Sequence, residues 1–368
     1  MDVSAFGLLY HGLPFHIMIS LRRPAVDASS LEVAADAVGS YARRVLGEGN
    51  KSAAHNFGHL QRVARYAPLI VRAAGGSRRD EELARIGGYL HDLVRSPTQT
   101  VDDETLSAKK AEPVLRGMKK FTEEDIHTIL AAVHSESMPK RLLGSGNKDY
   151  ASCFRGRELV CLAVGLADRI EANGAYIIAR RSQFVGGERF LYGDLGRLRR
   201  RLEEERHPFA REFDPRMAVL CESYIRLGMK NNQDFYPKWF LPVVRRLFFE
   251  QRSFYYALMA SKGLMEADVA RILIEIGFPA VTGHEIIEWE RKRLDSGREV
   301  SAVTEEQIGA AVEVVAFFSA PEIASMDTAG AIGKFKTSNP VAARWHGEMM
   351  DYLRGGLAEQ ISNLRLRG

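Results

Sequence analysis

Apolar residues recur along most of this chain every three to four positions, which is the period of an amphipathic helix. Strand-like alternation is weak even at its one candidate, residues 14–20. The pattern therefore predicts an all-α fold. In the first half of the chain, helices are expected over 30–47, 57–74, 83–93, 103–118, 122–134 and 156–181.

The second half of the chain is also predicted to be helical, but it carries no motif that indicates a role. At 368 residues the chain is long for one core, and Gly186-Gly187 marks the boundary we expect. We predict an N-terminal segment and helix over 1–50, a domain over 51–186 and a helical region over 187–368. Helices in that last region are expected near 194–206, 214–230, 236–261, 265–276, 283–295, 304–319 and 339–364.

Three short strings carry the candidate chemistry: HNFGHLQRV at 55–63, GGYLHDLVR at 87–95 and LADRI at 166–170. They supply His59, His91, Asp92 and Asp168, and each lies beside an apolar helical stripe. An unpaired carboxylate in such surroundings would be costly, because burial removes its hydration. Imidazole and carboxylate are a ligand pair for catalytic divalent metals. The sequence therefore predicts that these four residues bind one metal ion.

The ligand types also limit the metal. Mixed nitrogen and oxygen ligands suit manganese, iron, nickel, cobalt or zinc, whereas magnesium prefers oxygen ligands and fits less well. Adjacent side chains on a helix point about 100° apart. His91 and Asp92 can therefore both reach one ion only if the ion lies over the edge between the two side chains. We therefore expect this pair at the end of a helix that faces the interior of a bundle.

The order His, His-Asp, Asp on successive helices resembles the HD superfamily of metal-dependent phosphohydrolases. The resemblance covers about residues 50–175. It implies an HD-domain helical bundle with an additional C-terminal helical region, and a metal-activated water that cleaves a phosphoester. The stretches that carry it are HxxxHxxRV at 55–63, LHDL at 90–93, LSAKKAEPVL at 106–115, AAVHS at 131–135 and LADRIEA at 166–172.

The chain departs from the family pattern in two ways. Asn56 stands where many relatives carry Asp, so a contact behind the metal ligands is expected to differ. Between the HD pair and Asp168 the chain has only His127 and His134, whereas relatives with two metals carry more histidines there. One metal ion is therefore expected rather than two.

Further residues are expected to serve the reaction beside Asp92. The resemblance implies that His134 faces the site, and the alternative is a histidine that interacts with the helix dipole or water. Arg62 follows His59 by three residues and Arg95 follows His91 by four, which favours contact with phosphate oxygens. The alternative for Arg62 is an ion pair that anchors the bundle. The predicted catalytic set is Asp92, His134, Arg62 and Arg95.

The net charge of +4 is mild, so it fits a small anionic phosphorylated substrate, such as a nucleotide or phosphomonoester, better than nucleic acid. No apolar run approaches the ~20 residues that span a bilayer, so no membrane partner is expected. AFGLLYHGLPFHIMISL makes a poor signal peptide, which favours a cytoplasmic location. The sequence leaves open whether the chain forms a homo-oligomer.

Two other functions are also open. An HD-fold sensor or scaffold would use the C-terminal half to bind a partner. An HD-type iron oxygenase ranks lower, because it needs a fuller set of histidines than this chain offers.

Overall fold

The structure is a computed structural model, and the secondary structure within its described residues is helical without a strand. This confirms the all-α prediction. The candidate strand at 14–20, the boundary at Gly186-Gly187 and most of the helices expected between 194 and 295 lie outside the described residues. The described residues are 28–49, 56–94, 103–134, 157–171, 203–204, 236–247, 304–318 and 328–364.

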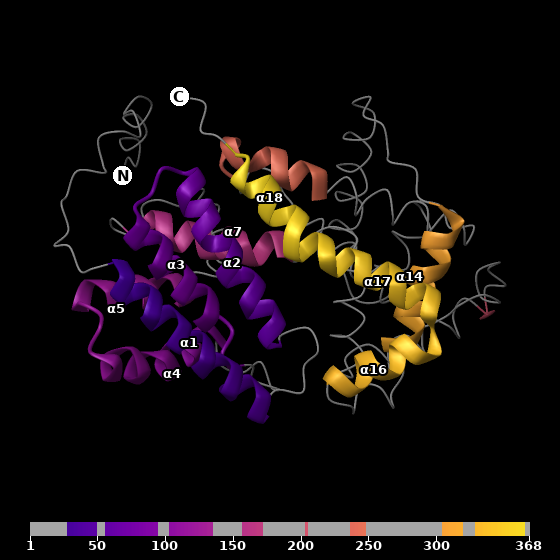
Figure 1. Cartoon of the computed structure of the whole chain (residues 1–368), viewed down its shortest axis with the longest axis horizontal. Helices are drawn as coiled ribbons and strands as arrows, with labels where there is room; N and C mark the ends of the chain where they lie inside the picture. The colour runs from indigo at the N-terminus through magenta and orange to yellow at the C-terminus, as the bar shows by residue number, and fades with distance from the viewer. Residues whose placement is uncertain are drawn as a thin grey trace, which may run out of the picture.

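Helix α3 is the centre of the N-terminal bundle, because it packs against α1, α2, α5 and α7. Helices α2 and α7 also pack against each other, and Figure 1 shows α2, α3 and α7 side by side. The predicted stripes therefore face one another across a common core. The helices are α1 (Ala28–Gly49), α2 (Phe57–Ala73), α3 (Arg78–Leu90), α4 (Asp103–Met118), α5 (Glu123–His134) and α7 (Glu158–Glu171).

Polar side chains fix where α2 and α3 begin. The side-chain oxygen of Asn56 accepts a hydrogen bond from the backbone N–H of His59, 3.2 Å away, and so caps α2. Ser77 and Asp80 form a reciprocal capping box at the start of α3. Asn56, the departure from the family pattern, therefore holds the helical turn that carries His59.

Two glycines let α3 approach its neighbours closely. A Cβ atom on Gly88 would lie 2.7 Å from the Cα atom of Ala64 in α2, which is too close for a real contact. A Cβ atom on Gly87 would lie 3.1 Å from Val164 in α7. Gly88 therefore permits the contact between the backbones of α2 and α3 that brings His91 beside His59.

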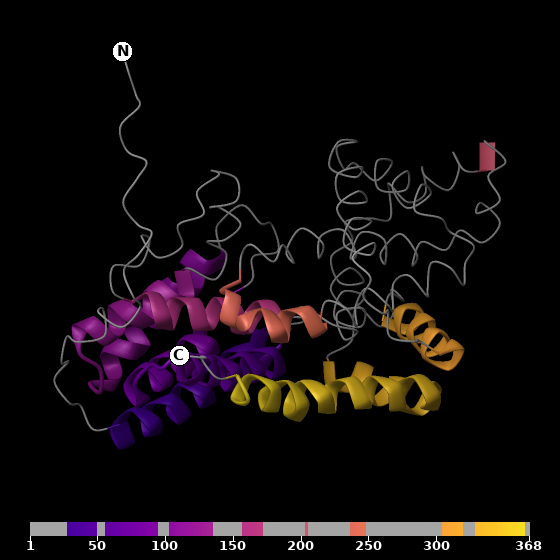
Figure 2. The same cartoon turned by 90° about the horizontal axis from the view of Figure 1, so that it is seen from above.

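The described parts of the C-terminal half pack onto this bundle. Buried residues from both halves, such as Leu60 and Ile170 in one and Phe240 and Leu357 in the other, have no more than a trace of exposed surface. Helix α17 continues through η5 into α18, and this long helix reaches α2 (Figures 1 and 2). The parts of this long helix are α17 (Pro340–Asp351), η5 (Tyr352–Gly356) and α18 (Leu357–Ser362). It packs against α14 (Glu305–Phe318) and α16 (Thr328–Ser338), and this half of the chain also contains η4 (Lys238–Phe240).

Two features of this region were not predicted. No helix was predicted over 328–338, where α16 lies, although Ala331 and Phe335 are buried one turn apart. The helix expected over 339–364 is interrupted by a π-helical turn at 352–356. The buried residues Met349, Leu353, Leu357 and Ile361 recur every four positions through this turn, so apolar period alone does not reveal it.

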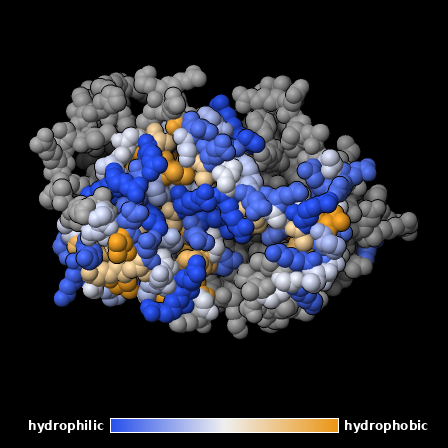
Figure 3. Space-filling model, in the orientation of Figure 1, coloured by the Kyte–Doolittle hydropathy of each residue, from blue (hydrophilic) through white to orange (hydrophobic). Residues whose placement is uncertain are grey.

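The described surface is mixed in character. In Figure 3 hydrophilic residues predominate on the visible face, and hydrophobic residues form small separate areas among them. Single exposed apolar residues are ordinary on a water-facing surface. No helix within the described ranges is long and apolar enough to cross a membrane.

We expect Gly88→Ala to lower the free energy of unfolding by about 1–3 kcal/mol, because the added methyl group must push α2 and α3 apart. Gly117→Ala in α4 is the matched control, since a Cβ atom there meets nothing within 4 Å. The control should leave stability unchanged or raise it by up to about 1 kcal/mol. Urea unfolding of both variants measures the difference, and equal effects would contradict the close approach at Gly88.

Acid should weaken the packing of α17 through His346. This residue is 8% exposed and packs edge-on against Phe335. Burial, with the charges of Lys336, Arg62 and Arg354, lowers the pKa of His346 to about 4. Because an unfolded histidine titrates near about pH 6.5, the unfolded state takes up a proton first as the pH falls.

The stability that neutral His346 contributes is therefore fully present above about pH 6.5 and is lost as the pH falls towards 4. At pH 5 the loss should be about 2 kcal/mol. We expect His346→Phe to lose about that much less stability than the wild type between pH 7.5 and pH 5 in urea unfolding. Identical losses in both proteins would show that His346 does not titrate in this way.

Candidate metal centre

His59 lies in the first turn of α2 and is completely buried. Its Nδ1 atom lies 2.9 Å from Oε2 of Glu171, whose carboxylate can only accept a hydrogen bond. The proton of a neutral His59 ring is therefore on Nδ1. This tautomer leaves the lone pair of Nε2 directed towards the interior of the bundle.

His91 is held in the same way at the end of α3. It is the C-cap residue, it is completely buried, and its Nδ1 atom lies 2.9 Å from the carbonyl oxygen of Gly88. A carbonyl also only accepts, so Nδ1 of His91 donates and Nε2 carries the lone pair. The pair His91-Asp92 thus lies at the helix end where the sequence predicted it.

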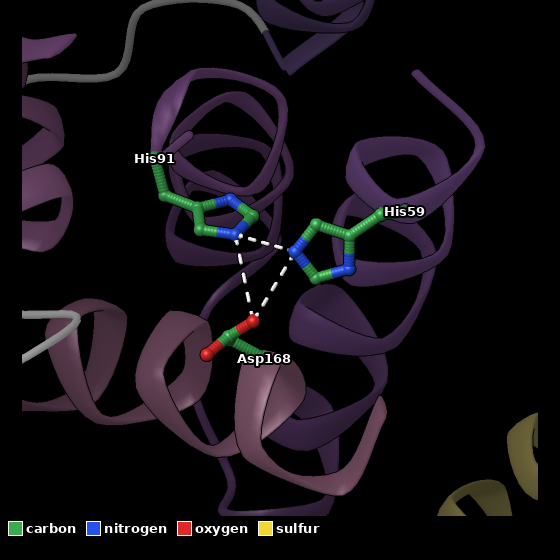
Figure 4. Close-up of side chains that lie close together, drawn as sticks. All are labelled: His59, His91 and Asp168. Atoms are coloured by element: carbon green, nitrogen blue, oxygen red, sulfur yellow. Dashed lines mark hydrogen bonds and ion pairs between the residues drawn. The ribbon is translucent and has the colours of Figure 1, made fainter. Parts of the chain in front are cut away.

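Asp168 of α7 completes a compact group with the two histidines (Figure 4). The Nε2 atoms of His59 and His91 are 3.1 Å apart. Oδ1 of Asp168 lies 3.2 Å from Nε2 of His59 and 3.7 Å from Nε2 of His91. Three of the four predicted ligands therefore come together from three different helices.

This geometry fits a shared cation. Metal–ligand bonds of about 2.0–2.2 Å separate neighbouring ligand atoms by about 3 Å, close to the distances between these three atoms. Since Nδ1 of both rings donates elsewhere, two neutral imidazoles would direct their lone pairs at each other across 3.1 Å. A positive charge between them removes that repulsion.

Asp168 is suited to the same role. Burial raises the pKa of its carboxyl, but its interactions with the neighbouring rings of His59 and His91 outweigh burial and hold the pKa well below its ordinary value. Asp168 is therefore ionised, which is the form that binds a metal.

Asp92 lies beside this group. It is 3% exposed, and its Oδ2 atom lies 3.7 Å from Nε2 of His59. Among the described residues, the group of three or more metal-ligating atoms that all lie within 4.8 Å of one another consists of atoms from His59, His91 and Asp168, without Asp92. The role of Asp92 as fourth ligand stays a prediction.

Glu171 is a residue of the candidate site that the sequence analysis did not predict. It is completely buried, and its two oxygens contact different partners: Oε2 accepts from His59, and Oε1 accepts from Nε of Arg62 at 2.6 Å. A terminal nitrogen of Arg62 contacts Oε1 as well. Glu171 therefore links a metal ligand to a buried positive charge.

The spacing of these residues could have revealed the link. Arg62 follows His59 by three residues, and Glu171 follows Asp168 by three, so each lies one helical turn from a ligand. Two helices that bring their ligands together also bring these neighbours together. The recorded contact of Arg62 matches the bundle-anchoring alternative; contact with phosphate stays a prediction.

The roles of two other predicted residues, His134 and Arg95, stay predictions. His134 is exposed at the C-terminal end of α5, and its role at the site stays a prediction. Arg95 lies outside the described residues. Arg169, next to Asp168, lies with its guanidinium 6.0 Å from the centre of the Tyr236 ring, a contact between α7 and the C-terminal region.

We expect Glu171→Gln to weaken metal binding by about 10–100-fold, because the group that orients a ligating histidine is replaced and Arg62 loses its counter-charge. Competition with a chelating dye for Co²⁺ or Zn²⁺ measures the change. Glu123→Gln is the control, since Glu123 makes an exposed ion pair with Arg116. Equal metal affinity in the two variants would show that Glu171 does not support the site.

Comparison with known proteins agrees with the geometry. A family model, the HD domain, matches residues 56–173, a range that contains His59, His91, Asp92 and Asp168. Searches of curated proteins and of solved structures found no match. Residues 56–173 therefore form an HD domain, the domain of the HD superfamily of metal-dependent phosphohydrolases.

Proposed function

We propose that this chain hydrolyses the phosphoester bond of a small anionic substrate, a nucleotide or a phosphomonoester, with one divalent metal ion at His59, His91 and Asp168. The observation that carries the proposal is the convergence of two imidazole lone pairs and one ionised carboxylate inside the HD domain. Manganese, iron, nickel, cobalt and zinc suit this donor set better than magnesium does.

When bound, such a metal lowers the pKa of a water ligand and polarises a phosphoryl oxygen. The chain's own residues supply what the metal cannot. Glu171 holds the tautomer and direction of His59, and the Gly88 carbonyl does the same for His91. Burial of both imidazoles excludes competing water and strengthens the local charges.

Three further roles belong to the proposal. Asp92, which lies 3.7 Å from His59, is proposed as a fourth ligand that also orients the attacking water. His134 is proposed to donate a proton to the leaving group, and Arg95 to contact phosphate oxygens. The charge of Arg62 is balanced by Glu171, which supports a role in holding Glu171 in addition to any contact with phosphate.

The test is metal analysis combined with a panel of phosphoesters. Wild-type protein supplied with manganese, nickel or cobalt should hold about one metal ion per chain and release phosphate from one class of the panel. His91→Ala and Asp168→Asn should lose the metal and lower kcat/KM by at least about 100-fold. His127→Ala, which removes an exposed histidine of α5, is the matched control and should change neither.

Two outcomes would contradict the proposal. Retention of metal and activity by His91→Ala and Asp168→Asn would show that the site is elsewhere. Wild-type protein that holds a metal but cleaves no phosphoester in the panel would refute hydrolysis and favour a sensor or scaffold.

A further inference from the structure

The long C-terminal helix leaves the regular α-helical path at residues 352–356, and this part of it lies near α2. There the backbone N–H of Leu357 donates to the carbonyl of Tyr352, five residues back, which defines a π-turn. A π-turn is wider than an α-turn, so its carbonyl groups can reach donors on a neighbouring helix. Single π-turns inside α-helices occur often at functional sites.

Tyr66 of α2 supplies such a donor. Its side chain is completely buried, and its hydroxyl group donates a hydrogen bond to the carbonyl of Leu353 in the π-turn. Burial raises the pKa of Tyr66 above its ordinary value, and the negative charge of Glu171 raises it further. The hydroxyl is therefore a neutral donor inside the interface between α2 and the C-terminal helix.

Tyr66 also lies next to the groups behind the metal ligands. It follows Arg62 by four residues and His59 by seven, so the three share one face of α2. The charges of Glu171 and Arg62 both act on the Tyr66 hydroxyl. On α17, His346 is close enough for the charge of Arg62 to lower its pKa. The C-terminal helix thus borders the chain of contacts from Arg62 through Glu171 to His59.

We propose that Tyr66 is a positioning residue of the metal centre. Its hydrogen bond to Leu353 fixes the C-terminal helix against α2, and this contact holds Arg62 and Glu171 where Glu171 orients His59. The helix over 340–362 is then part of the support of the metal centre, although it lies outside the residues that the HD family model matches. This inference rests on metal binding as proposed above.

Two adjacent glycines in the π-turn provide matched variants. A Cβ atom on Gly356 would lie 2.7 Å from Cδ2 of the Tyr352 ring, so alanine there must displace this ring of the π-turn. A Cβ atom on Gly355 meets nothing within 4 Å. Both substitutions raise helix propensity equally, and only Gly356→Ala disturbs the packing of the turn.

The experiment titrates the full-length protein with Co²⁺ and follows its visible absorption, which reports both affinity and ligand geometry. Tyr66→Phe removes one oxygen atom and should raise the Kd for Co²⁺ by about 3–10-fold and alter the absorption bands. Gly356→Ala should act in the same direction, and Gly355→Ala should match the wild type. In a Glu171→Gln background, Tyr66→Phe should have no further effect, because its influence passes through Glu171.

Several results would overturn the proposal. Unchanged Co²⁺ affinity and absorption in Tyr66→Phe, with only a lower melting temperature, would leave Tyr66 as a residue of helix packing. Full additivity of Tyr66→Phe and Glu171→Gln would exclude the route through Glu171. Wild-type protein that binds no Co²⁺ would refute the metal centre itself. If Gly356→Ala does not fold, the titration of Tyr66→Phe alone decides whether Tyr66 positions the metal centre.

Discussion

A buried carboxylate, Glu171, joins the two helices on which the candidate metal centre depends. Removing it from water is unfavourable unless each oxygen has a partner, and the partners are both on α2: the imidazole of His59 and the guanidinium of Arg62. The ion pair therefore does more than hold α7 against α2. It fixes which nitrogen of His59 carries the proton, and so it connects the packing of the bundle with the chemistry of its ligands.

The sequence was sufficient for the features that depend on local period and residue type. The stripes from Phe57 and Leu83 predicted α2 and α3, and the ligand types identified His59, His91 and Asp168 before any distance was known. Where sequence reasoning failed, the missing information was a contact between distant parts of the chain. Glu171 and Arg62 are 109 residues apart, and their spacing from the ligands indicates that they meet only once the two helices are known to bring those ligands together.

Contacts between distant parts of the chain also explain why two elements of the C-terminal half were not predicted. Its helices over 305–318 and 340–362 were expected, but the π-turn between α17 and α18 arises where Tyr66 donates to a backbone carbonyl from another helix. Helix α16 was missed because its buried residues, Ala331 and Phe335, give too short a stripe to stand out among glycines. These elements acquire their form from tertiary contacts, which override weak local preference.

The capping of α2 has a further consequence for the metal centre. Helix ends open more readily than helix centres, and both histidines lie at such ends: His59 in the first turn of α2, and His91 just beyond α3. Asn56 closes the first of these ends by accepting from the backbone N–H of His59 itself. His59 is thus held twice, by its main chain and by its ring. Fraying of this turn would therefore also release an ion bound at the candidate site.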